Sequence, residues 1–235
     1  MFKTDLHIHS CASPCADADM TPEAIVSAAV QAGLDLIAVT DHNTCRNSAA
    51  VQSAAEKAGI SAVPGIEVTT IEDIHCICLF PDIGKVSSFS RWMDTLLPKP
   101  RTRPGAPAPK MTPEAVAARR QLEERKIAYM AREISITELS SAVERFRGIW
   151  WPAHVGKPYN SVLAILGSWP EDLQTWGAEL FGNEARPESI PDGIPVLRVS
   201  DAHHLWELNS GGFEMALTSP DFNGLKHYLQ PMAQH

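Results

Sequence analysis

The chain has 235 residues, of which 44% are hydrophobic and 20% are charged, so it can bury the core of one large α/β domain. No apolar run reaches the ~20 residues of a membrane-spanning helix, and the N-terminus lacks the apolar centre of a signal peptide. We therefore expect a cytoplasmic protein. The net charge of −8 argues against a general nucleic-acid-binding surface.

The first half of the chain alternates strands and helices. An apolar run from Phe2 ends in the stretch Asp5-Leu-His-Ile-His-Ser10 and predicts the first strand. Thr21-Pro-Glu is a helix-start pattern, and glycines end the predicted helices. We expect helices over 21–33 and 48–58, and further strands over 34–40, 60–68 and 74–80. This order predicts parallel strands with crossover helices.

The pattern breaks at residues 98–109, which hold five prolines and no apolar periodicity and predict a surface excursion. After it we expect helices over 112–133, 137–147, 160–166 and 221–229, and strands over 149–155, 178–181, 195–200 and 212–217. Charge is uneven here. Residues 91–132 hold ten Lys or Arg against four Asp or Glu, a net charge of +6. Because the whole chain has a net charge of −8, the remaining residues have a net charge of −14.

Histidines and acids gather at the ends of the predicted strands. His7 and His9 point from the same face of the first strand, because side chains alternate along a strand. Two surface histidines on an edge strand are the plain alternative. The ends of parallel strands converge, however, and the same positions of later strands carry His or an acid. The full set is His7, His9, His42, Glu67, His154, Asp201 and His203, with His75 near the start of its strand. These are ligand types for Zn²⁺, Mn²⁺ or Fe²⁺, and they predict a multinuclear metal site.

The five cysteines are odd in number and match no disulfide framework, so we expect free thiols. We interpret Cys76 and Cys78 as strand packing. Cys11 and Cys15 follow the first strand beside the predicted site and are candidates for accessory metal ligands.

The motifs resemble those of the polymerase and histidinol phosphatase (PHP) family. The resemblance rests on residues 5–10, on Thr40-Asp-His-Asn43, Pro64-Gly-Ile-Glu-Val-Thr69 and His75, and on Pro152-Ala-His154 and Ser200-Asp-Ala-His203. It implies an α/β fold, a distorted (β/α)7 barrel of the PHP type, with three metal ions in its C-terminal mouth. We expect one PHP domain over 1–235, with a helical and Pro-rich insertion or lid at about 91–147.

The resemblance also implies a ligand set for three divalent transition metals, of which Mn, Zn and Fe are the candidates. Glu67 would bridge two of these ions. The first would be held by His7, His9, Glu67 and Asp201, the second by Glu67, His75 and His154, and the third by Asp17, His42 and His203. Asp19 competes with Asp17, because this loop is longer than the family's usual Ser-Asp-Gly.

The predicted function is hydrolysis of a phosphate ester, either a small phosphomonoester or a nucleotide, by a metal-bridging hydroxide. Glu67 and Asp201 are the predicted catalytic residues. The end of an oligonucleotide is a possible partner, and a membrane is not. One alternative is an amidohydrolase-type C–N hydrolase, whose barrel also begins with His-x-His. Another is a catalytically silent, metal-binding regulatory domain.

The remaining candidates lie around the ligands. Lys157, Arg119, Arg120 and His204 are candidates for substrate binding, and solvated side chains are the plain alternative. The basic segment 91–132, with Arg101 and Arg103 on its approach, is either a solvated excursion or a lid that contacts substrate phosphate. Asp5 and Asp41 adjoin ligand histidines and can orient them.

Overall fold

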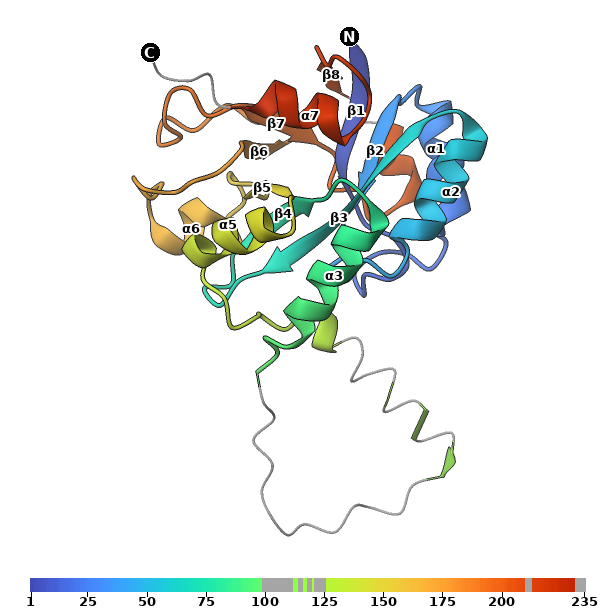
Figure 1. Cartoon of the computed structure of the whole chain (residues 1–235), viewed down its shortest axis with the longest axis horizontal. Helices are drawn as coiled ribbons and strands as arrows, with labels where there is room; N and C mark the ends of the chain where they lie inside the picture. Colours follow the sequence, from blue (N-terminus) through green and yellow to red (C-terminus); the bar gives the residue numbers. More distant parts are fainter. Residues whose placement is uncertain (99–111, 114–115, 118–119, 121–125, 210–212, 231–235) are drawn as a thin grey trace.

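The protein has an α/β fold built on a curled six-stranded sheet and a second sheet of two strands (Figure 1). A computed structural model describes residues 1–98, 112–113, 116–117, 120, 126–209 and 213–230. The strands run in the order β5-β4-β3-β2-β1-β8, and β6 pairs with β7. Their bounds are β1 Phe2–Ile8, β2 Leu36–Val39, β3 Ser61–Thr69, β4 His75–Leu79, β5 Ile149–Pro152, β6 Ala178–Phe181, β7 Val196–Val199 and β8 Phe213–Met215.

The helices begin where the sequence supplies capping side chains. Thr21 accepts a hydrogen bond from the backbone N–H of Ala24, and Ser135 and Glu138 form a capping box. The second helix ends at Gly59, whose φ of 77° lies in the left-handed region that glycine tolerates. The helices are α1 Pro22–Gln31, α2 Ser48–Ala58, α3 Ile83–Asp94, α5 Ile136–Arg145, α6 Val162–Leu166 and α7 Phe222–Leu229, with a 3-10 helix, η1, over Leu205–Asn209.

Three apolar clusters hold the layers together. Helices α1 and α2 cover one side of β1 and β2, where Ile25 and Val51 pack against Ile37 (Figure 1). Helices α3 and α5 pack against β3 and β4 through a cluster that includes Phe89 and Leu139. Burial of these side chains contributes ~25 cal/mol for each Å² of apolar surface removed from water. The packing fixes the strands, and through them the residues at the strand ends.

The expected parallel pairing is confirmed for β1, β2 and β3. It is wrong for β4, which pairs antiparallel with β3 on one side and with β5 on the other. Only a tight turn joins β3 to β4, closed by a 2.9 Å hydrogen bond from Thr70 N–H to the Ile74 carbonyl. A parallel pair requires a crossover of a dozen or more residues, so this short link reverses the chain.

Other sequence-based expectations also have clear outcomes. Helix α3 was not predicted, although Asp82 caps it. Of the helix expected over 112–133, residues 114–115, 118–119 and 121–125 lie outside the described part of the chain; 113, 116–117, 120 and 126–129 are helical, and 130–133 are not. Cys76 and Cys78 are buried on β4, as the packing interpretation expected. Within the described residues, no helix is both long and apolar enough to cross a membrane.

Candidate metal centre

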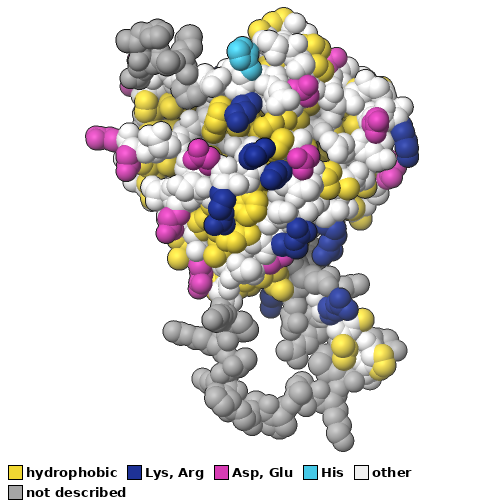
Figure 2. All heavy atoms as spheres, in the orientation of Figure 1, with side chains coloured by type: hydrophobic (Ala, Val, Ile, Leu, Met, Phe, Trp, Pro, Cys, Tyr) yellow, Lys and Arg dark blue, Asp and Glu magenta, His cyan; other side chains and the backbone are white. Residues whose placement is uncertain are grey.

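The strand ends bring the predicted histidines and acids into one buried cluster. His7 lies on β1 and His9 just after it, and the N–H of His9 donates to the Ala202 carbonyl, which ties this end to the segment after β7. An isolated β-bridge sets His42 beside Glu67. The N–H of Val155 donates to the carbonyl of Glu179, which places His154 beside β6. Figure 2 shows one face of the molecule, on which little histidine surface is visible.

Glu67 lies at the centre of the cluster and is 1% exposed. Its Oε2 lies 2.9 Å from Nδ1 of His42, and its Oε1 lies 2.9 Å from Nδ1 of His75 and 3.3 Å from Nε2 of His154. Burial alone raises the pKa of Glu67, but the neighbouring imidazoles outweigh it and hold this pKa well below its ordinary value. The carboxylate is therefore charged and can bridge two cations.

A second contact joins the two histidines of the first motif to Asp201. The Nε2 atoms of His7 and His9 lie 3.1 Å apart, and each lies 3.2 Å from Oδ1 of Asp201. Burial raises the pKa of Asp201, but the charge of His7 prevails and holds it well below its ordinary value. His154 and Asp201 have positive φ angles of 31° and 50°, so strained backbone aims both side chains.

Buried hydrogen bonds fix the ring of His7. Its Nδ1 donates to Oε1 of Glu179 over 2.8 Å, which leaves Nε2 facing the cluster. Glu179 is fully buried and also accepts from the Trp151 indole and from the His154 backbone N–H. The carboxylate therefore positions two histidines of the cluster through one side chain.

Ser13 and Asp41 fix the ring of His9 in the same way. The Ser13 hydroxyl donates to Oδ1 of Asp41 over 2.6 Å, so its oxygen accepts from His9 Nδ1 at 2.9 Å and from the His42 backbone N–H at 3.1 Å. Nε2 of His9 is left with its lone pair toward the cluster. Asp41 therefore orients the His9 ring, as expected, but does so through Ser13. Asp5 does not reach the His7 ring, and its Oδ1 accepts from Ser200 N–H instead.

The donor set fits divalent cations. Within the described residues, three groups place one ligand atom from each member within 4.8 Å of the others: His7, His9 and Asp201; His42, Glu67 and His75; and His9, Cys15, His42 and His203. Oε2 of Glu67 and Nδ1 of His42 are buried and lie 2.9 Å apart. Within the described part of the chain, neither atom makes a hydrogen bond of acceptable geometry. A cation between such atoms satisfies both, because imidazole and carboxylate are its ordinary ligands.

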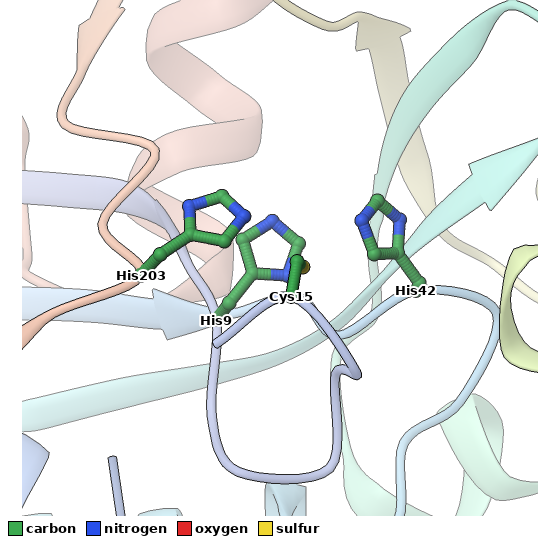
Figure 3. Close-up of side chains that lie close together, drawn as sticks. All are labelled: His9, Cys15, His42 and His203. Carbon is green, nitrogen blue, oxygen red and sulfur yellow. The ribbon is translucent and has the colours of Figure 1, made fainter. Parts of the chain in front are cut away.

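The structure does not bring Asp17 to this cluster. The Asp17 carboxylate is 56% exposed and accepts a 2.6 Å hydrogen bond from Nδ1 of His204. This bond raises the pKa of His204. In the described part of the chain, neither Asp17 nor Asp19 belongs to a ligand group, whereas Cys15 does (Figure 3). The sequence spacing favoured Asp17, but the turn through Ser13 points Cys15 inward instead.

The predicted substrate-binding residues are split. Nζ of Lys157 contacts Oδ2 of Asp201 beside the cluster, whereas His204 lies on the outer rim. Arg119 lies outside the described residues, and Arg120 is exposed. A cavity of about 610 Å³ is lined by residues that include His42, Arg46 and Arg132.

Sequence reasoning missed Glu179 and Ser13. Glu179 had one available signal, since it is an acid inside the short apolar strand 178–181. Ser13 had none, because its role depends on the fold of the loop that follows β1.

The chain belongs to the PHP domain family, which matches residues 5–149. Among curated proteins it is similar to the 5'-3' exoribonuclease Rnm of Escherichia coli, with 36% identity over 84 residues, or 34% of this chain and 28% of that protein. The match thus spans less than a third of this relative's length.

Two solved structures share the fold. The lesion-specific endonuclease PfuEndoQ of Pyrococcus furiosus has a TM-score of 0.69 at 19% identity, covering 97% of this chain and 56% of that one. A protein of Bifidobacterium adolescentis described as a putative metal-dependent phosphoesterase has a TM-score of 0.59 at 19% identity, covering 96% and 95%. At these identities the likeness concerns the fold alone.

Proposed function

We propose that this chain is a metal-dependent phosphoesterase that hydrolyses a phosphate ester. The observation that carries the proposal is the buried Glu67 carboxylate, surrounded by imidazoles from several strand ends. The proposed metal ligands are His7, His9, His42, Glu67, His75, His154, Asp201 and His203. We propose about three ions, of Mn, Zn or Fe, because the described residues form three ligand groups.

The residues of the chain take distinct parts in this function. Bound divalent ions supply an acidified water and positive charge that stabilises phosphate oxygens. Glu67 and Asp201 would hold the cations, since both carboxylates are buried and charged. The ammonium group of Lys157 contacts Asp201, and we propose that it binds a further phosphate oxygen of the substrate.

A nucleotide or the end of an oligonucleotide is the substrate class that we favour. The similarity to an exoribonuclease supports it. So do aromatic side chains near the cluster: Trp206 is 70% exposed and stacks on His204, and Tyr159 is 61% exposed near Lys157. Exposed aromatic rings offer surfaces on which bases stack.

We also propose the (β/α)7 barrel and a lid for this chain. Contacts of β7 with β1 and of β6 with β5 support closure of the strands into a ring. The lid would be the part of 91–147 between α3 and α5, because both helices pack in the core. Its end reaches the site, where Asn43 Nδ2 donates to the Ala128 carbonyl and the Tyr129 ring lies 5.1 Å from that of His42.

An activity panel tests the function. Purified protein would be stripped of metal, reloaded with Mn²⁺, Zn²⁺ or Fe²⁺, and assayed on phosphomonoesters, nucleotides, single-stranded oligonucleotides and amides. We expect hydrolysis that needs metal, measured as free phosphate from phosphomonoesters and as released nucleotides from oligonucleotides. This activity should be lost in Glu67→Gln and stay at the wild-type level in the exposed control Glu56→Gln. Amide hydrolysis alone would favour the amidohydrolase alternative. Metal binding without any hydrolysis would favour the silent regulatory domain.

A further inference from the structure

Cys15 shares one pocket with three histidines. Its Sγ and a ring nitrogen from each of His9, His42 and His203 all lie within 4.8 Å of one another. Figure 3 shows the thiol between the rings of His42 and His203, in front of His9. His9 and Cys15 lie on the loop after β1, and His42 and His203 follow β2 and β7, so three separate segments converge on this point. Two or more imidazoles with a thiol form a typical donor set for a transition metal.

The position of Cys15 is fixed by the loop that carries it. On one side, Ser13 is held by its hydroxyl bond to Asp41 and by a 2.9 Å bond from its N–H to the Ser10 carbonyl. On the other side, the Asp17 N–H donates to the His203 carbonyl over 3.1 Å. Cys15 lies midway between these anchors. Its backbone is therefore tied both to the first motif and to the last.

We propose that Cys15 is a thiolate ligand of the metal ion held by His42 and His203. This inference rests on the metal-dependent function proposed above and assigns to Cys15 the position that the family resemblance gave to Asp17. The Asp17 carboxylate is engaged with His204. A thiolate at this position favours Zn²⁺, Fe²⁺ or Co²⁺ over Mn²⁺ and Mg²⁺, which prefer oxygen ligands.

Cys11 provides a matched comparison on the same loop. Like Cys15 it is an exposed free cysteine, but its Sγ contacts the Asn47 amide at 3.6 Å and belongs to none of the ligand groups among the described residues. Partial enclosure, with the Glu67 charge, raises the pKa of the Cys15 thiol to about 11 despite a hydrogen bond with Tyr129. A cation that binds there displaces the thiol proton to solvent.

Cobalt substitution tests the ligand directly. Metal-free full-length protein would be titrated with Co²⁺, and the near-ultraviolet absorption of sulfur-to-cobalt charge transfer would be recorded with the bound cobalt. We expect the band in wild type and in Cys11→Ser, and its loss in Cys15→Ser and Cys15→Asp. Cys15→Asp is expected to keep its full metal content, with its preference shifted toward Mn²⁺.

Alkylation gives a second readout that needs no substitution. Zn²⁺ is expected to slow the reaction of Cys15 with iodoacetamide by about tenfold or more while leaving Cys11 unchanged, because a coordinated thiolate is a poor nucleophile. Three outcomes would overturn this inference and leave the phosphoesterase proposal intact. They are cobalt binding without the charge-transfer band, a band that survives in Cys15→Ser, and equal alkylation of Cys15 with and without Zn²⁺. Failure to bind any cobalt would overturn both.

Discussion

The inner and outer halves of the metal centre are built differently. The inner half surrounds Glu67, and its side chains come from strands or their immediate ends; His7 is 0% exposed and His154 is 3% exposed. The outer half consists of loop residues, among them Cys15, which is exposed, and His203, whose side chain is 25% exposed. Strand register fixes the first set, whereas hydrogen bonds within a loop fix the second. The inner half is therefore the rigid part of the site.

The largest expected effect comes from breaking the inner half at its centre. Glu67→Gln removes a charge that touches several imidazoles, and we expect it to reduce metal-dependent phosphoesterase activity by more than about 100-fold. His203→Ala removes one ligand of the outer half and should cost about tenfold. Activity at saturating Mn²⁺ measures both. Equal, mild losses would mean that the two halves do not differ as described.

A smaller effect is expected when the inner half loses its support without losing a ligand. In Glu179→Gln, one carboxylate oxygen becomes an NH₂ group, so it can no longer accept from His7, His154 and Trp151 together. We expect metal affinity to fall by about 10- to 100-fold. Glu188→Gln, on the exposed surface, is the matched control. Unchanged metal affinity in Glu179→Gln would show that the His7 ring needs no such partner.

The pH dependence of folding stability is a further test of the buried strand β1, which carries Asp5 and His7. Burial raises the pKa of Asp5 from 3.8 to about 7 in the folded protein. The folded state therefore holds this proton more tightly, and the stability of the metal-free protein falls as pH rises from about 4 to about 7. Asp5→Asn should remove that fall and, at pH 8, stabilise the metal-free protein by on the order of 1–3 kcal/mol.

Thermal unfolding of the metal-free proteins at several pH values measures this effect, with exposed Asp172→Asn as the control. Parallel pH profiles for wild type and Asp5→Asn would contradict a raised pKa at Asp5.

The sequence predicted the inner half better than the outer half, for which it named His203 and gave Cys15 only as an accessory candidate beside the preferred Asp17. Period-two alternation places His7 and His9 correctly, and the motifs around His42, Glu67 and Asp201 lie at strand ends as expected. The loop after β1 was different. Nothing in its sequence showed that Asp41 would bind Ser10 and Ser13 and thereby turn Cys15, rather than Asp17, toward the histidines. Strand β4 runs antiparallel to β3 because the turn between them is too short for a crossover. The sequence analysis missed this, because the strand–helix alternation before β4 favoured another parallel strand.

The smallest effect is expected beyond the outer half, in the basic segment. Replacing Arg101, Arg103, Arg119 and Arg120 by Gln should raise KM for an anionic substrate by roughly twofold to tenfold, because each ionic contact that water and salt screen contributes little. Metal content should stay unchanged, and Lys57→Gln on α2 serves as the control. If KM and its salt dependence do not move, the segment is a solvated excursion.

The most direct test of the metal centre is the number of ions that the purified, reconstituted protein holds, measured by elemental mass spectrometry alongside protein concentration. The three ligand groups predict about three ions per chain in the wild type and fewer in Glu67→Gln. Less than one ion per chain in the wild type after reconstitution would contradict the assignment of these residues as a metal centre.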